Sequence, residues 1–287
     1  MEDFFGKLFD FNATLELLGY DFVRNALLAA AVLGLVSGAL APMVVARRMS
    51  FAVHGTAELA FTGAAAALLI GTSVGGGALA GSVVAALLLG LLGQRDGERD
   101  SVIGAVLSFG LGLGVLLLAL YPGRTSNKFS LLIGQIVGVD SADLVLLTVA
   151  ALAVLVVFGF IYRPLLFASV DTEVAVARGV PVRVLTPLFA VLVGVATALG
   201  VQTVGALLVL ALMVTPGAAA ARLTANPTMA IVLSVVFAEV AALGGILLSL
   251  APGVPVSAFI TTISFVIYLI CRAAGTARLK SLSARRA

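Results

Sequence analysis

The segment AVHGTAELAF, residues 52–61, contains the only histidine of this 287-residue chain, His54, and an acidic residue, Glu58, four positions later. On an α-helix, residues four positions apart lie on the same face. Imidazole and carboxylate both bind divalent transition metals, and together they suit Zn²⁺ or Mn²⁺ better than Ca²⁺. The pair therefore predicts a site for a transition-metal ion. The structural alternative is a His–Glu hydrogen bond that ties this helix to a neighbour.

The composition around this pair is that of a membrane protein. Apolar residues make up 61% of the chain and charged residues 11%, and the mean hydropathy is +1.20. A soluble globular protein has about 25% charged residues, whereas a membrane-spanning helix needs about 20 apolar ones. The fold class expected is an all-α polytopic membrane protein. An acid in mid-membrane costs about 2.5–3.5 kcal/mol to insert, so a function is the default explanation for Glu58.

We expect eight or nine transmembrane helices in a single transmembrane domain, residues 1–287. The apolar stretches that define them are 22–46, 50–71, 77–93, 101–121, 143–162, 184–202, 204–222, 228–250 and 256–271. Almost nothing separates the stretches 184–202 and 204–222. One of these two, or 77–93, is therefore expected to be a re-entrant or broken helix, which leaves the count at eight or nine.

The basic residues predict the orientation. They concentrate in alternate loops, beginning with Arg47 and Arg48, so the positive-inside rule places the N-terminus outside and the C-terminus in the cytoplasm for nine spans. The cytoplasmic loop from Tyr162 to Pro187 contains DTEVAVARG, which is typical of a short helix at about 171–179. This helix is either an amphipathic connector on the membrane or a docking helix for a cytoplasmic partner.

Helix-end signals support that short helix. Asp171 or Thr172 can cap its start, Glu173 lies in its first turn, and Gly179 can end it. The small side chains of Ala175 and Ala177 would let it sit closely in a partner's groove. These signals predict a short helix in this loop.

Five segments resemble the permease of the zinc- and manganese-type ABC importers, in order, over roughly residues 25 to 272. They are RRMSFAVHGTAELAFTGAAAALL, LLIGQIVGVDSADL, YRPLLFASVDTEVAVARGVPV, QTVGALLVLALMVTPGAAAARL and GGILLSLAPGVPVSAFITTISFVIYLICR. The resemblance implies a vitamin-importer-type (type II) ABC permease fold in the bacterial cytoplasmic membrane. It also implies a homodimeric pore, two copies of a separate cytoplasmic ATP-binding subunit, and an extracytoplasmic metal-binding protein.

The resemblance further implies that the ATP-binding subunits contact the short cytoplasmic helix. The implied coupling residues are Asp171, Glu173, Ala175, Ala177 and Gly179. Independently, the chain has no G-x-x-x-x-G-K-[ST] loop for phosphate, so ATP hydrolysis must come from another subunit. We expect no enzymatic activity and no permanently bound cofactor, only the transported Zn²⁺ or Mn²⁺.

The chain departs from the family pattern at the candidate metal site. Family members typically have Asp at the position of His54 and His at the position of Glu58, so the same kinds of ligand stand in the opposite order. Two protomers would bring two imidazoles and two carboxylates to one pore, and Zn²⁺ accepts four ligands. Histidine favours zinc and carboxylate favours manganese, and we lean to zinc. Thr56 and Thr62 are expected to bond their own helix backbone.

A few other polar residues are further candidates. Glu239 could face the pore and contact the metal, pair with a polar group of another helix, or be protonated. Gln202 could line an outer gate. Asp140, Ser141 and Asp143 are expected to cap the helix that starts there, with contact to the delivery protein as the alternative.

The sequence thus predicts the membrane permease of an ATP-driven importer for a divalent transition metal, with zinc first. One alternative is a manganese, iron-chelate or vitamin ABC permease. The other is an ion-gradient-driven carrier in which His54 and Glu58 relay protons.

Overall fold

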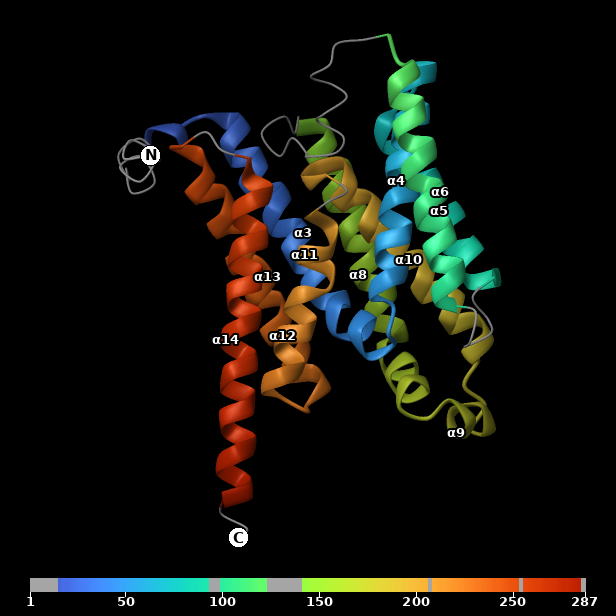
Figure 1. Cartoon of the computed structure of the whole chain (residues 1–287), viewed down its shortest axis with the longest axis vertical. Coiled ribbons are helices and arrows are strands. Elements are labelled where there is room, and N and C mark those ends of the chain that lie inside the picture. Colours follow the sequence, from blue (N-terminus) through green and yellow to red (C-terminus); the bar gives the residue numbers. More distant parts are fainter. Residues whose placement is uncertain (1–14, 93–98, 123–140, 206–207, 253–254, 285–287) are drawn as a thin grey trace. The chain divides into compact units, whose positions relative to one another are not determined.

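The computed structural model describes residues 15–92, 99–122, 141–205, 208–252 and 255–284, and every regular element in these ranges is a helix (Figure 1). The expected all-α class is therefore confirmed. The helices are α3 (Asp21–Ala46), α4 (Ser50–Ile70), α5 (Val74–Leu92), α6 (Arg99–Leu120), α8 (Ser141–Val170), α9 (Thr172–Ala177), α10 (Val182–Val204), α11 (Val209–Met213), α12 (Thr215–Leu223), α13 (Pro227–Leu250) and α14 (Val256–Ala284).

Seven of the described helices are long and apolar enough to cross a membrane. Two shorter apolar stretches, Val74–Leu89 and Val209–Leu223, stand where the other two spans were expected. The second is interrupted at Val214, between α11 and α12. The interruption therefore falls in one of the three stretches that were expected to be broken or re-entrant. Seven of the expected spans are therefore long enough among the described residues, and the two shorter stretches account for the difference from the expected eight or nine.

Two helices extend beyond their predicted ends. The segment after Tyr162 was expected to be a loop, but α8 continues through Pro164 to Val170. It continues because apolar side chains of this segment are buried, with Leu165 fully inaccessible to solvent. Similarly, α14 continues past residue 271 to Ala284. Tertiary packing and the chain's own helical tendency outweigh the local polarity that marked these predicted ends.

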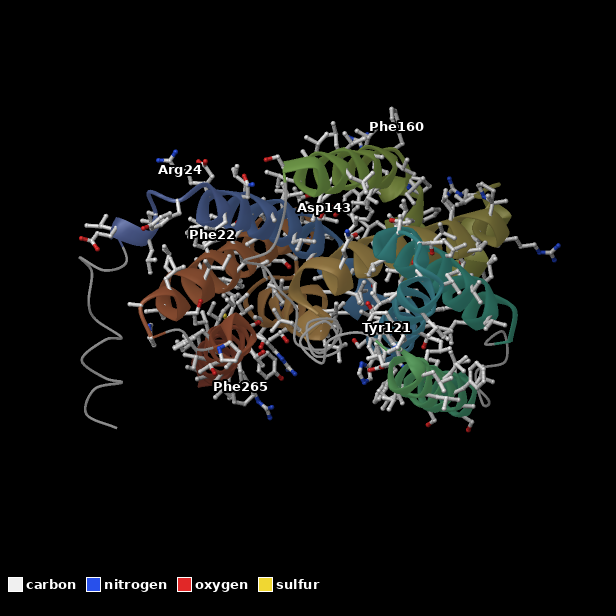
Figure 2. The ribbon with its side chains drawn as sticks, turned by 90° about the horizontal axis from the view of Figure 1, so that it is seen from above. Phe22, Arg24, Tyr121, Asp143, Phe160 and Phe265 are labelled. Atoms are coloured by element: carbon white, nitrogen blue, oxygen red, sulfur yellow. The ribbon has the colours of Figure 1, made fainter. Side chains whose placement is uncertain are left out.

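Large apolar side chains cover faces of these helices that have no protein neighbour. Phe160 of α8 is 82% exposed and Phe265 of α14 is 56% exposed. Both point away from their own ribbons in Figure 2. Such surfaces are unfavourable in water and suit the hydrocarbon of a bilayer.

The chain divides into two compact units. The first consists of Met1–Val45 and Ala211–Ala287, and the second of Ala46–Leu210. In the first unit, α3 lies against α13 at Gly38, where an added methyl group would stand 2.6 Å from the Cα of Val235. Small residues spaced like Gly34 and Gly38 let membrane helices approach closely without large side chains between them.

The second unit encloses α4. This helix packs against α5, α6 and α10 (Figure 1). Of its most apolar 18-residue stretch, 67% is buried. It ends at Gly71, whose φ of 74° is left-handed and whose N–H bonds back to the last turn. The enclosed position matters because α4 carries both His54 and Glu58.

Candidate functional site

His54 and Glu58 are the fifth and ninth residues of α4. The rise of an α-helix is about 1.5 Å per residue, so the two positions are about 6 Å apart along the axis and share one face. Glu58 is only 3% exposed, and His54 is partly buried. The structure therefore brings the predicted pair together inside the second unit.

Both side chains have a buried polar atom without a partner. Nδ1 of His54 and Oε2 of Glu58 are buried and make no hydrogen bond in the described part of the chain. The structural alternative was a His–Glu hydrogen bond to a neighbouring helix. Neither Nδ1 of His54 nor Oε2 of Glu58 forms such a bond with any described residue. Because a buried polar group without a partner costs about 1–3 kcal/mol, both atoms favour the arrival of a ligand.

Neighbouring helices fix the backbone of Glu58. Gly110 of α6 lies over it, and a methyl group added there would stand 3.3 Å from the Cβ of Glu58. The hydroxyl of Thr62 is within hydrogen-bond distance of the carbonyl oxygens of Glu58, at 2.8 Å, and of Gly110. Thr56 donates to the Ala52 carbonyl at 2.7 Å. Both threonines therefore bond helix backbone, as predicted.

The surroundings of Glu58 on α4 are apolar. Its neighbour Leu59 forms a buried cluster with Ala85 of α5 and Val106 of α6. In such an environment a carboxylate attracts a cation more strongly than it would in water, because the effective dielectric constant is lower. The pair can therefore hold a divalent cation with few ligands.

One copy of the chain offers an incomplete coordination shell here. Among the described residues there is no group of three or more His, Cys, Asp or Glu side chains that could hold a metal ion. Because structural zinc sites use four ligands, His54 and Glu58 would leave positions open for other ligands. An ion bound by few protein ligands can also leave the site more easily.

Glu239 lies in α13 and belongs to the first unit. Its carboxyl group lies against Gly34 of α3, where an added methyl group would stand 3.0 Å from both Cδ and Oε1. Glu239 is partly buried, unlike the nearly inaccessible Glu58. The structure thus places this acid beside a helix backbone.

Gln202 lies in the last turn of α10, in the second unit. Its side-chain amide lies against Gly75 of α5, where an added methyl group would stand 2.7 Å from Oε1. Of the predicted capping residues of α8, Ser141 begins the helix and Asp143 lies in its first turn. Asp140 is outside the described residues.

A short helix, α9, lies within the range 171–179 where one was predicted. α9 follows Asp171, whose side chain accepts a hydrogen bond from the Val174 N–H at 3.0 Å. Glu173 lies in its first turn, and Gly179 has a left-handed φ of 81°. α9 joins α8 to α10 and packs against both of them (Figure 1).

The two alanines of α9 differ in accessibility. Ala175 is fully buried within the chain, whereas Ala177 is exposed. Two apolar neighbours that were not singled out in the sequence, Val174 and Val176, are 43% and 57% exposed. The only sequence feature that could have drawn attention to these valines is their alternation with alanine in TEVAVA. Val174 and Ala177, three positions apart, share one exposed face of α9, whereas Val176 points to another side.

The chain is similar to known proteins over most of its length. Residues 19–274 match the ABC 3 transport family. The manganese transport system membrane protein MntC of Halalkalibacterium halodurans is 30% identical over 256 residues, covering 89% of this chain and 88% of its own length. The manganese import system permease protein ScaB of Streptococcus parasanguinis is 29% identical, covering 88% of this chain and 90% of its own.

Two solved structures have similar folds. PsaBC from Streptococcus pneumoniae, in complex with Fab, superposes with a TM-score of 0.82 at 26% identity, covering 91% of this chain and 94% of that one. An inward-facing metal-chelate type ABC transporter superposes with a TM-score of 0.70 at 15% identity, covering 93% and 97%. The chain therefore belongs to the ABC 3 transport family, as a multi-pass membrane permease of the metal-importing ABC transporters.

Proposed function

We propose that this permease imports manganese, with zinc as the alternative cargo, through a pore formed by two copies of the chain. The names of the related MntC and ScaB proteins support manganese. The leaning to zinc rested on one histidine and finds no support in those names. Mn²⁺ accepts carboxylate oxygen and imidazole nitrogen, so His54 and Glu58 suit it chemically.

The observation that carries this proposal is the pair of unpartnered buried atoms on α4, Nδ1 of His54 and Oε2 of Glu58. In a twofold pore, the second copy contributes the same two ligands, which gives two imidazoles and two carboxylates. Glu239 is a further candidate for contact with the ion, because it is an acid within an apolar helix of the same chain.

The finer features of the fold are part of the same proposal. The superposition on the metal-chelate type transporter supports an ABC permease fold, for which we propose the type II arrangement. The N-terminus would lie outside, as the distribution of basic residues predicts. The single transmembrane domain would then contain both compact units.

The motor and the delivery protein are proposed as separate subunits. Two copies of an ATP-binding subunit would dock on α9 through Asp171, Glu173, Ala177 and the exposed valines. The buried Ala175 would hold the helix against the permease, and Gly179 would form the turn after it. An extracytoplasmic metal-binding protein would deliver the ion. The exposed side chains of Val174 and Ala177, which share one face of α9, support the docking role, because apolar residues at this spacing can enter a hydrophobic groove.

Uptake of radioactive manganese and zinc tests the function directly. Cells that lack the gene are complemented with the wild-type chain or with Glu58→Ala, and membrane levels are measured for both. We expect the wild type alone to restore manganese uptake, and ATP depletion to stop it. Uptake that survives ATP depletion but stops when the ion gradients collapse would establish a carrier instead.

The docking role of α9 has its own test. Ala177→Arg should abolish transport and co-purification of the ATP-binding subunit while leaving the permease in the membrane, because the large charged side chain projects from the accessible face. Ala177→Ser is the matched control with a small side chain. Normal transport by Ala177→Arg, with the ATP-binding subunit still bound, would exclude docking at this position.

A further inference from the structure

Arg47 connects two distant parts of the second unit. It lies between α3 and α4, and its Nη1 donates to the Oγ of Ser169 at 3.0 Å while its Nη2 donates to the Oγ1 of Thr186 at 2.9 Å. Ser169 is in the last turn of α8, and Thr186 is near the start of α10. α9 joins these two helices (Figure 1). One guanidinium group therefore holds the segments on both sides of α9.

The chemistry of this contact requires arginine. A guanidinium group is planar and presents its N–H groups in a rigid fork, so it can bond two acceptors at fixed positions together. The hydroxyl of Ser169 donates its own proton to the Leu165 carbonyl at 2.6 Å, which leaves its lone pairs free to accept from Arg47. A lysine has a single ammonium group and lacks the fork.

The other end of the connection leads directly into the candidate metal site. Arg47 is three residues before Ser50, the first residue of α4. At about 1.5 Å per residue, His54 and Glu58 lie about 6 and about 12 Å further along the helix axis. Met49, between Arg47 and α4, is buried, so the connection is anchored in the unit.

The backbone of this connection is also under constraint. Arg48 has a φ of 54° and is the one non-glycine residue with positive φ in the described part of the chain. Residues in such conformations persist where their surroundings hold them, and they concentrate at functional and switching sites. A tight connection of this kind transmits a displacement of Arg47 to the start of α4.

We propose that Arg47 is a positioning residue that couples α9 to the metal pair on α4. A displacement of α9 by the ATP-binding subunit moves the adjoining ends of α8 and α10. The fork of Arg47 carries that movement to α4, and so to His54 and Glu58. The inference rests on the proposed docking role of α9 and the proposed metal role of the pair. All these residues belong to the second unit.

The test is the ratio of manganese transported to ATP hydrolysed. The full transporter, with its ATP-binding subunit and metal-binding protein, is reconstituted in liposomes, and both rates are measured with Mn²⁺ as the cargo. Arg47→Gln should keep ATP hydrolysis within about twofold of wild type while the ratio falls about 10-fold, a size typical of coupling between sites. The ratio of Arg47→Lys should lie between those of the wild type and Arg47→Gln.

A second variant addresses the same bonds from the other side. Ser169→Ala with Thr186→Val removes both acceptors, leaves Arg47 in place and should lower the ratio as much as Arg47→Gln does. Adding Arg47→Gln to this double variant should lower the ratio by less than Arg47→Gln does alone, because the three residues share these two hydrogen bonds and so act non-additively. This variant also keeps the inference testable if Arg47→Gln does not fold.

Matched controls are available on α8. Arg163 is an exposed arginine, and Thr148 bonds its own Leu144 carbonyl at 2.7 Å. Arg163→Gln and Thr148→Val should leave the ratio unchanged.

A wild-type ratio in Arg47→Gln would overturn the coupling inference, whether both rates stay normal or transport and hydrolysis fall in proportion. A wild-type transporter that moves neither Mn²⁺ nor Zn²⁺ would instead contradict the proposed function.

Discussion

Two acidic side chains lie within apolar helices of this permease, Glu58 in α4 and Glu239 in α13, and their surroundings differ. Glu58 is 3% exposed, has an unpartnered carboxylate oxygen, and follows the chain's one histidine by a helical turn. Glu239 is partly buried and lies against the backbone of Gly34. Both acids are costly in a membrane, but one of them has a second metal-binding group on its own helix face.

The difference shows what a transport site needs beyond an intramembrane acid. A lone carboxylate can be satisfied by a proton or by one polar neighbour. A carboxylate beside an imidazole, both with unpartnered buried atoms, offers two ligands of different kinds to one ion. The pair on α4 is therefore the stronger candidate for the ion path, and Glu239 is the weaker one.

The largest expected effect is the loss of either member of the pair. His54→Ala and Glu58→Ala should each lower manganese uptake by at least about 100-fold, because changes that only touch a metal ligand's neighbours already cost about 10- to 100-fold. Each change removes two of four ligands in a twofold pore. The permease should stay in the membrane as a dimer, measured by cross-linking. Normal import by His54→Gln would mean that the pair is structural.

Exchanging the pair should restore part of this loss. The double variant His54→Asp with Glu58→His gives the order that is typical of the family, and it keeps one imidazole and one carboxylate on the same helix face. Uptake should recover to within about 10-fold of wild type, because groups around the ligands are tuned to the original order. A double variant as inactive as the single ones would show that position matters more than ligand type.

A smaller loss is expected at the other acid. Glu239→Gln keeps the shape and removes the charge, and it should lower manganese uptake by about 10-fold or less, equivalent to about 1.4 kcal/mol. Uptake is measured beside Glu58→Gln, the same change at the first site. A loss at Glu239 that equals or exceeds the loss at Glu58 would reverse the ranking of the two acids.

The sequence predicted much of the fold because membrane helices are local in origin. A long apolar stretch must satisfy its backbone hydrogen bonds internally, so it becomes a helix whatever it packs against. α9 was equally predictable, since Asp171 and Gly179 mark its two ends by their own side-chain and backbone chemistry. The pair on α4 followed from a spacing of four residues.

The features that were missed depend on residues far apart in the chain. The bonds from Arg47 to Ser169 and Thr186 join residues 122 and 139 positions apart. From the sequence alone, Arg47 could be interpreted only as one of the positive charges that set the orientation of the chain in the membrane. The extension of α8 through Pro164 depends on burial of Leu165, and the burial of Ala175 depends on how α9 packs against α8 and α10. Such contacts have no local pattern.

The smallest effect is expected at Gly34, which sets the position of Glu239. An added methyl group would stand 3.0 Å from the carboxyl carbon, so Gly34→Ala should displace the carboxyl group by a few tenths of an ångström. Manganese uptake should fall by about threefold, equivalent to about 0.7 kcal/mol. In the Glu239→Gln background the same change should cost less, because residues in contact act non-additively. Gly159→Ala is the control, since an added methyl group there meets nothing within 4 Å. A threefold loss that is the same in both backgrounds would mean that Gly34 acts through helix packing. The contact between Gly34 and Glu239 would then give no support to a role of Glu239 in transport.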